Sequence, residues 1–353
     1  MSFLSKSAKF FAAFAFSLFL LPVLAFSQYT RTDLVTGAKP DQDLINAWGL
    51  TRSDSGSPFW VSDNGTGKST LYNGAGQKQG LVVTIPPAPS TPQPAIGTPT
   101  GTVFNITLSN PVPSFVLPNG RPAIFLFATL DGTISGWNGG PTAVIPPPAD
   151  RSAFGAVYTG LAITSDGNGG DFLYATDNGP NSRIDVFKKD FTWIGSFTDP
   201  VASEGGLAPY GIQNIDGKLW VTFGGNKKSR AGGAGAVVEF DPATQEVLLR
   251  IVGTAPLHSP WGLAKAPANF GPFSNALLVA NNVPGGRINA FDINTGAFLG
   301  TLRDTAGQAI VIDQVWALQF GNGGRGGQTN QLFFTAGPNN YANGLFGMIA
   351  FGQ

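Results

Sequence analysis

One short sequence motif, called the phrase below, recurs six times along the chain, and its spacing restricts the fold more than any other feature. Typically a proline or small residue is followed by an aromatic residue or threonine, then glycine and an aliphatic residue. The copies begin at Ala47, Pro99, Tyr158, Pro209, Pro260 and Val315. Their second residues fall at 48, 100, 159, 210, 261 and 316, which gives steps of 52, 59, 51, 51 and 55 residues. A near-constant period of this length is typical of repeat folds in which each repeat forms one unit.

Each repeat contains further strand-like segments after the opening phrase. An apolar segment ending in Asp, Asn or Gly comes next, then a third segment, and in five repeats a fourth. The sixth repeat ends after its third segment, at Gln353, while residues 29–35 form an unassigned segment before the first phrase. Because an open ring leaves strand edges unpaired, we expect residues 29–35 to complete the last repeat. The sequence therefore predicts an all-β, six-bladed β-propeller with four-stranded antiparallel blades; a sandwich or a solenoid is the alternative.

The second segments also predict the core. Middle strands of a blade are covered on both faces by neighbouring blades, so their apolar residues run nearly continuously. The residues expected to be buried are Phe59, Val61, Phe125, Phe127, Leu173, Leu219, Val221, Leu277, Val279, Leu332 and Phe334.

Composition limits the possible partners. Charged residues make up only 12% of the 353 residues, and Lys+Arg 21 balances Asp+Glu 21 without a basic run. Nucleic acid and anionic membrane surfaces are therefore not expected as partners. The chain has no cysteine, so a domain in an oxidising compartment would depend on core burial and ring closure rather than on disulfides.

The N-terminus has the form of a secretory signal. Two lysines precede the apolar run of residues 10–24, and small residues follow it. Such a run is short for a membrane span, which needs about 20 residues. We expect residues 1–27 to be a signal peptide, residues 28–353 to form a single propeller domain, and the mature protein to be extracytoplasmic, in the periplasm or outside the cell, with no further membrane span. An uncleaved anchor is the alternative.

Several long phrases resemble a family of uncharacterised secreted bacterial proteins. They are PFWVSDNGTG, ATLDGTISGWN, APYGIQNIDGKLWVTF, PWGLAKAPANFGPFSNALLVAN and VWALQFGNGG. The resemblance covers essentially the whole chain after the leader and implies an NHL-like six-bladed propeller with no established activity. Some members of that family carry a C-terminal PEP-CTERM sorting tail, whereas this chain ends at GMIAFGQ.

Two sets of residues are expected to meet at one end of the central axis of the propeller, which we call the mouth. The reason is that antiparallel strands place the start of one strand beside the end of its partner. One set is aromatic and the other is made of polar strand ends. The candidate ligand-binding residues are Trp48, Asp63, Asn64, Asp177, Asn178, Tyr210, Trp261, Asn281, Asn282 and Trp316. A small molecule, a glycan or a peptide is the expected class of ligand. Alternatively, the aromatic residues pack between blades and the Asp and Asn residues form turns.

Three functions remain open from the sequence. The first is a non-catalytic secreted binding or interaction protein. The second is a metal-dependent, lactonase-like hydrolase, in which Asp63, Asp177, Asn214 and Asn281 would supply oxygen ligands to Ca²⁺. Against it, none of the three glutamates lies in an opening phrase, and the lone His258 has no evident catalytic partner. The third is a structural protein of the envelope or matrix. No catalytic residue and no cofactor are expected, with Ca²⁺ as the alternative, and the metal-ligating residues are left unassigned.

Overall fold

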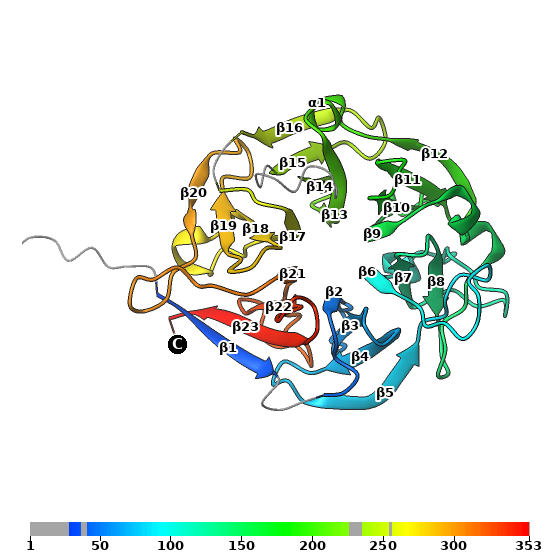
Figure 1. The fold of residues 1–353 in the computed structure, drawn as a ribbon, viewed down its shortest axis with the longest axis horizontal. Coiled ribbons are helices and arrows are strands. Elements are labelled where there is room, and N and C mark those ends of the chain that lie inside the picture. Colours follow the sequence, from blue (N-terminus) through cyan, green and yellow to red (C-terminus); the bar gives the residue numbers. More distant parts are fainter. Residues whose placement is uncertain (1–27, 37–40, 226–234, 254–255, 353) are drawn as a thin grey trace, which may run out of the picture.

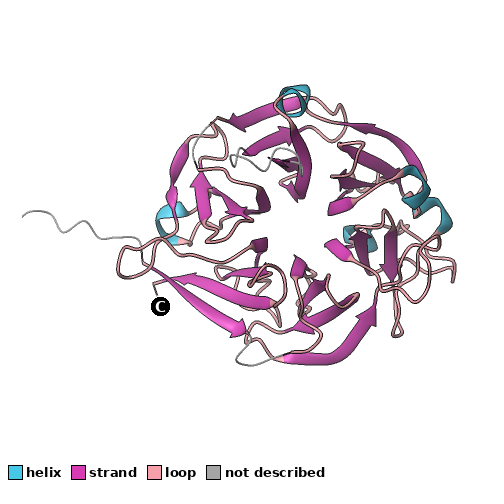
Figure 2. Ribbon diagram, in the orientation of Figure 1, coloured by secondary structure: helices cyan, strands magenta, loops and turns pink. Residues whose placement is uncertain are grey.

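The chain folds into six β-sheets arranged radially around a central axis (Figures 1 and 2). The computed structural model describes residues 28–36, 41–225, 235–253 and 256–352. The expected signal peptide, residues 1–27, lies outside the described residues. The predicted six-bladed β-propeller is confirmed.

The first three blades follow one another along the chain, each beginning at its inner strand. Blade 1 contains β2 (Ala47–Thr51), β3 (Phe59–Asp63), β4 (Lys68–Tyr72) and β5 (Lys78–Thr84). Blade 2 contains β6 (Pro99–Phe104), β7 (Phe125–Thr129) and β8 (Ile134–Trp137). Blade 3 contains β9 (Tyr158–Thr164), β10 (Phe172–Asp177), β11 (Arg183–Lys188) and β12 (Trp193–Phe197).

The other three blades repeat this order. Blade 4 contains β13 (Leu207–Ile215), β14 (Lys218–Gly225), β15 (Gly235–Phe240) and β16 (Val247–Val252). Blade 5 contains β17 (Pro260–Lys265), β18 (Leu277–Asn281), β19 (Ile288–Phe291) and β20 (Phe298–Thr301). Blade 6 contains β21 (Val315–Phe320), β22 (Leu332–Ala336), β23 (Leu345–Phe351) and β1 (Tyr29–Val35). The connections include the short helix α1 (Pro200–Glu204) and the 3₁₀ turns Ile106–Ser109, Pro147–Ala149, Ser152–Phe154 and Gly271–Phe273.

The two ends of the chain close the ring in blade 6. Strand β1 pairs antiparallel with β23, from Tyr29 opposite Phe351 to Val35 opposite Phe346. The Tyr29 hydroxyl also donates a hydrogen bond of 2.7 Å to the Phe270 carbonyl oxygen of blade 5. Closure by residues 29–35 is therefore confirmed, and these long-range contacts tie the first segment of the chain to its last two blades.

Blade 2 departs from the expected pattern because it has three strands instead of four. The predicted fourth strand, residues 142–148, makes only isolated bridges: Val144 with Gly136 of β8, and Thr142 with Thr84 of blade 1. The physical reason is proline, which cannot donate a backbone hydrogen bond. Residues 146–148 are all proline, and the chain turns into a 3₁₀ helix there.

The core lies between the blades, as expected. All eleven residues predicted from the second segments are buried, with exposed fractions of 3% or less. The stacked pairs of neighbouring blades include Trp60 of blade 1 with Phe125 of blade 2, whose ring centroids are 4.1 Å apart. Aromatic contacts of this kind also join other neighbouring blades, such as Phe59 of blade 1 with Phe333 of blade 6 and Phe197 of blade 3 with Phe240 of blade 4.

Candidate functional site

Every inner strand has a β-bulge at the recurring phrase. In β2, for example, Ala47 pairs with Asp63 but Leu50 pairs with Val61, so one extra residue lies on the inner strand. The same irregularity occurs at the equivalent place in the other five blades. A bulge re-aims the side chains at its position. The six bulges therefore repeat one local geometry around the axis.

The aromatic residues of the phrase converge on the axis. The rings of Trp48 and Trp316 are stacked with centroids 3.6 Å apart, and Trp261 meets both rings edge-on at 6.3 and 5.8 Å. Tyr210 meets Trp316 at 5.8 Å. The three tryptophans are 6%, 2% and 7% exposed for Trp48, Trp316 and Trp261. We call Trp48, Tyr210, Trp261 and Trp316 the aromatic plug, because their rings pack against one another across the centre of the ring of blades.

The glycine of the phrase lets neighbouring inner strands approach closely. A Cβ atom on Gly211 would lie 2.1 Å from the carbonyl oxygen of Trp261 in the next blade. A Cβ on Gly262 would lie 2.3 Å from the carbonyl oxygen of Trp316. Real Cβ atoms do not come so near to backbone oxygen, so only glycine fits these two positions without movement of the strands.

Three of the predicted polar residues join one blade to the next. Each asparagine directly after a second strand donates its side-chain amide to a backbone carbonyl at the start of the next recurring phrase. The pairs are Asn64 with Pro99 at 3.2 Å, Asn178 with Pro209 at 2.9 Å and Asn282 with Val315 at 3.1 Å. We call these three bonds the asparagine clasps. They fix the position of the carbonyl that precedes each second residue of the phrase.

Asp177 is a buried turn-forming residue. Its Oδ1 atom accepts hydrogen bonds from the backbone N–H groups of Val157 and Gly179, both at 2.9 Å. Its Oδ2 atom accepts one from the Asn181 amide at 3.1 Å. Asn281 has a similar role, because its Oδ1 accepts from the His258 N–H at 3.2 Å and its amide donates to Pro256 at 2.7 Å.

Asp63 occupies the same place in blade 1 but has a different environment. The side chain is fully buried, and neither carboxylate oxygen has a partner in hydrogen-bonding geometry. Burial raises the pKa of Asp63 well above its usual range, and the nearby Asp41 carboxylate adds to the rise. The Thr70 hydroxyl offsets part of it. The carboxyl group is thus held in its neutral form over a wider pH range than an ordinary aspartate.

The predicted juxtaposition at the mouth is confirmed as geometry. Ala47 pairs with Asp63, Tyr158 with Asp177 and Pro260 with Asn281, so each phrase begins beside a polar strand end. The assignment of these residues to ligand binding stays a prediction.

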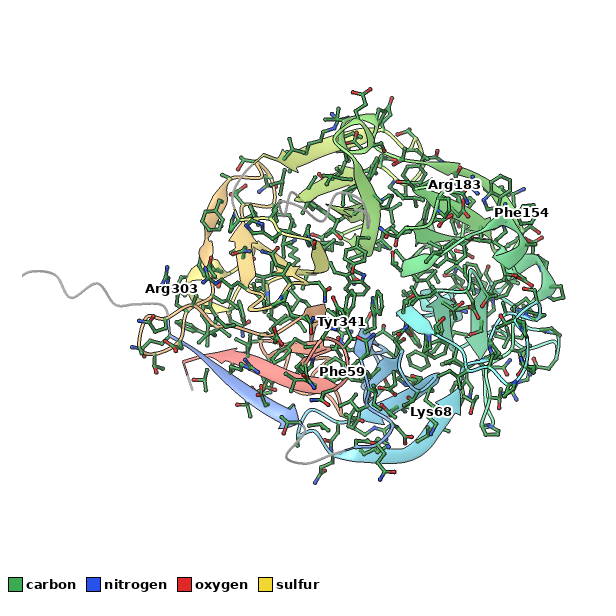
Figure 3. All side chains as sticks on the ribbon, viewed as in Figure 1. Phe59, Lys68, Phe154, Arg183, Arg303 and Tyr341 are labelled. Atoms are coloured by element: carbon green, nitrogen blue, oxygen red, sulfur yellow. The ribbon has the colours of Figure 1, made fainter. Side chains whose placement is uncertain are left out.

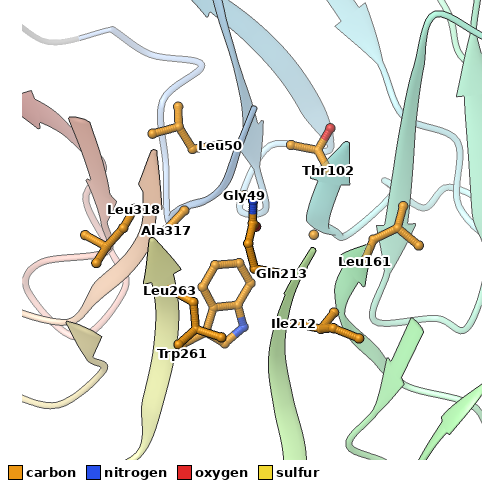
Figure 4. Close-up of a pocket in the computed structure, with 11 residues that line it drawn as sticks. Gly49, Leu50, Thr102, Leu161, Ile212, Gln213, Trp261, Leu263, Ala317 and Leu318 are labelled. Atoms are coloured by element: carbon orange, nitrogen blue, oxygen red, sulfur yellow. The ribbon is translucent and has the colours of Figure 1, made fainter. Parts of the chain in front are cut away.

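A small cavity lies beside the aromatic plug on the axis (Figure 4). Trp261 and the fourth residues of all six phrases line it: Leu50, Thr102, Leu161, Ile212, Leu263 and Leu318. Its volume is about 20 Å³. A buried water occupies roughly 10–15 Å³ on this measure, so the cavity has room for one or two waters.

The residues considered for a metal do not form one cluster. Asn214 pairs with Leu219 near the turn between β13 and β14, away from the end of β14 that corresponds to Asp63 and Asp177 in their blades. Its amide donates to the Ile163 carbonyl at 2.8 Å. Within residues 28–36, 41–225, 235–253 and 256–352, no group of three His, Cys, Asp or Glu side chains could hold a metal ion. The His258 side chain is exposed.

Sequence reasoning missed Tyr341, which joins the plug from the loop between β22 and β23 (Figure 3). Its ring lies 5.6 Å from that of Trp316, and its hydroxyl donates to Asn282 at 2.9 Å. Asn339, Asn340 and Tyr341 all have left-handed backbone, with φ of 57, 52 and 66°. The Asn-Asn pair is a turn signal in the sequence, but nothing in the repeat marks the tyrosine after it.

Comparison with known proteins gives relatives without an assigned activity. No family model matches the chain. Three uncharacterised proteins of Acanthamoeba polyphaga mimivirus are similar to it. The first is 31% identical over 252 residues, which cover 62% of this chain and 45% of that protein. The others are 27% identical over 331 and 338 residues, covering 88% and 89% of this chain and 76% and 82% of the relatives.

The chain thus spans less than half the length of the first relative. These relatives are viral, so they do not support the bacterial family that the sequence phrases resemble. They support neither secretion nor a sorting tail.

Solved structures show the same fold at low identity. A gluconolactonase of Xanthomonas campestris is 13% identical with a TM-score of 0.56, covering 88% of this chain and 87% of that one. A luciferin-regenerating enzyme is 12% identical with a TM-score of 0.55, covering 87% and 92%. At such identity the likeness concerns the fold alone. Fold and comparisons together define the chain as a six-bladed β-propeller whose structural neighbours include gluconolactonases.

Proposed function

We propose that this chain is a non-catalytic binding propeller that acts outside the cytoplasm and presents its mouth face to a partner. The observation that carries the proposal is the aromatic plug. Stacked rings occupy the centre, where a substrate would otherwise enter, and the cavity of about 20 Å³ beside them has room only for water. A ligand would contact the partly exposed edge of the plug, which includes Tyr210 and Tyr341.

The bonding of the polar residues supports the same proposal. The side-chain amides of Asn64, Asn178 and Asn282 donate the hydrogen bonds of the asparagine clasps. The carboxylate oxygens of Asp177 accept hydrogen bonds from three N–H groups. Side chains that are already hydrogen-bonded to neighbouring groups of the protein are poor candidates for metal or substrate ligands, because those bonds would have to break during catalysis. They are well suited to hold a rigid binding face.

A lactonase-like hydrolase is the second candidate, and the fold shared with gluconolactonases favours it. The unpartnered Asp63 carboxylate would then be its strongest potential ligand. Purified protein should be assayed for hydrolysis of gluconolactone with and without added Ca²⁺ or Zn²⁺, beside elemental analysis of protein prepared without chelators. We expect no stoichiometric metal and no metal-stimulated turnover. Turnover that is lost in Asp63→Asn would establish the hydrolase instead.

Binding is tested by immobilised glycan and peptide arrays probed with the full chain. We expect retention that weakens when Tyr210 or Tyr341 is replaced by Ala, with melting temperature as the control for folding. Retention unchanged in both variants would remove the mouth from the proposal. Secretion is tested separately by N-terminal sequencing of the protein recovered outside the cytoplasm, where cleavage near residue 27 is expected.

A further inference from the structure

A second candidate site lies away from the mouth, where blade 2 meets blade 3. It is built from alternating rings and guanidinium groups. The Cζ atom of Arg151 lies 3.9 Å from the ring centroid of Phe154 and 4.5 Å from that of Trp193. The Cζ atom of Arg183 lies 5.7 Å from the same Trp193 ring. We call these four residues the arginine–aromatic stack. Figure 3 labels Phe154 and Arg183 on the same side of the molecule, toward its outer edge.

The acidic groups near the stack already have their partners. Asp185 is fully buried and accepts from Arg183 Nε at 2.7 Å and from the Tyr158 hydroxyl at 2.8 Å. Both carboxylate oxygens of Asp177 accept hydrogen bonds, which come from two backbone N–H groups and the Asn181 amide. Among the described residues, the Arg151 guanidinium therefore forms no ion pair with a carboxylate.

Two N–H donors in the stack also lack acceptors. Arg151 Nε and Trp193 Nε1 are both buried, and neither has a hydrogen-bond partner. Unsatisfied buried donors are rare in folded proteins and call for a water or an ion as their partner. Contact with two rings limits the motion of the guanidinium, which removes part of the entropy cost of binding an oxyanion.

Around this donor set lies a surface suited to a sugar ring. Phe154 is 60% exposed, an unusual position for phenylalanine. The Ser152 hydroxyl, two residues before Phe154 in the chain, lies 3.0 Å from the hydroxyl of Ser90 in the loop after β5. Aromatic area next to hydroxyl groups fits the apolar face and polar edge of a pyranose.

From these observations we propose that the arginine–aromatic stack binds a uronate, a sugar whose carboxylate pairs with Arg151 and whose ring lies against Phe154. A carboxylate matches the planar donor edge of a guanidinium and can bind it in a bidentate manner. This proposal is independent of the mouth face and of the function proposed for it.

The test is titration calorimetry of the full chain with glucuronate, glucose and acetate. We expect saturable binding of glucuronate that weakens with added salt, at least tenfold weaker binding of glucose, and weaker binding of acetate than of glucuronate. Arg151→Gln should weaken glucuronate binding at least tenfold, and Phe154→Ala several-fold. Arg121→Gln, an exposed arginine of blade 2 outside the stack, is the matched control and should bind as the unmodified chain does.

Three results would overturn the proposal. They are no saturable binding of glucuronate, acetate binding as tightly as glucuronate, and glucuronate binding unaffected by Arg151→Gln. If Arg151→Gln does not fold, as judged by circular dichroism and its melting temperature, Phe154→Ala decides, because its exposed ring contributes little to the core. Unchanged glucuronate affinity in Phe154→Ala would then refute the contact with the sugar ring.

Discussion

Gly211→Ala tests the close approach of neighbouring inner strands. The added Cβ would lie 2.1 Å from the Trp261 carbonyl oxygen, against a relaxed separation of roughly 3.5 Å. The obstacle is backbone, so no side chain can rotate away, and blades 4 and 5 must move apart by more than 1 Å at this point. Overpacking of this kind costs about 3 kcal/mol. For a chain of 353 residues we expect a fall in melting temperature of roughly 4 °C.

Gly80→Ala is the matched control. Gly80 lies in the outer strand β5, its backbone is not left-handed, and a Cβ there would meet nothing within 4 Å. We expect a gain of about 0.5 kcal/mol, because alanine restricts the unfolded chain. Thermal melts followed by circular dichroism measure both variants. Equal melting temperatures for Gly211→Ala and the unmodified chain would refute the account of the recurring glycine as a packing requirement.

Four further predictions concern the mouth. Asp63→Asn should become more stable relative to the unmodified chain as pH rises. The pKa of Asp63 in the folded state lies above its unfolded value of about 3.9, so the unmodified chain loses stability from about pH 4 upward until the folded-state pKa is passed. Asparagine does not titrate, so the variant does not lose stability in this way. Melting curves at pH 4 and 8 test this, and a stability difference between the two chains that is the same at both pH values would contradict it. Asp177→Asn places an amide against the Asn181 amide and should therefore be destabilising by about 1–3 kcal/mol. Asn178→Ala should cost about 1–2 kcal/mol in chemical unfolding by removing one asparagine clasp, and an unchanged midpoint would show that the clasp adds nothing. Trp261→Ala should cost about 3–5 kcal/mol because the ring packs in the plug, whereas a melting temperature close to that of the unmodified chain would restore a purely ligand-binding role for this tryptophan.

Much of the fold could be predicted because the repeat records it directly. Six copies of one phrase, with an N-terminal segment to spare and a sixth unit one strand short, predicted closure by β1 against β23. The apolar second segments predicted the buried middle strands, since residues covered on both faces must be apolar. The error concerned blade 2, where the chain carries the right apolar residues but three successive prolines remove the N–H groups that a strand needs.

The hydrogen bonds and packing contacts of the mouth residues could not be predicted, because they depend on residues that are distant in the sequence. Asp63 and Asp177 occupy one position of the repeat, yet Asp177 is filled by N–H groups from its own turn and from Val157, while Asp63 is buried without such donors. The sequence alone predicted that each phrase begins beside a polar strand end, but it did not predict that Tyr341 joins the plug. Only the tertiary structure decided that bulges turn the tryptophans onto the axis, where they pack against one another, because ring contacts across the centre join residues more than 200 positions apart.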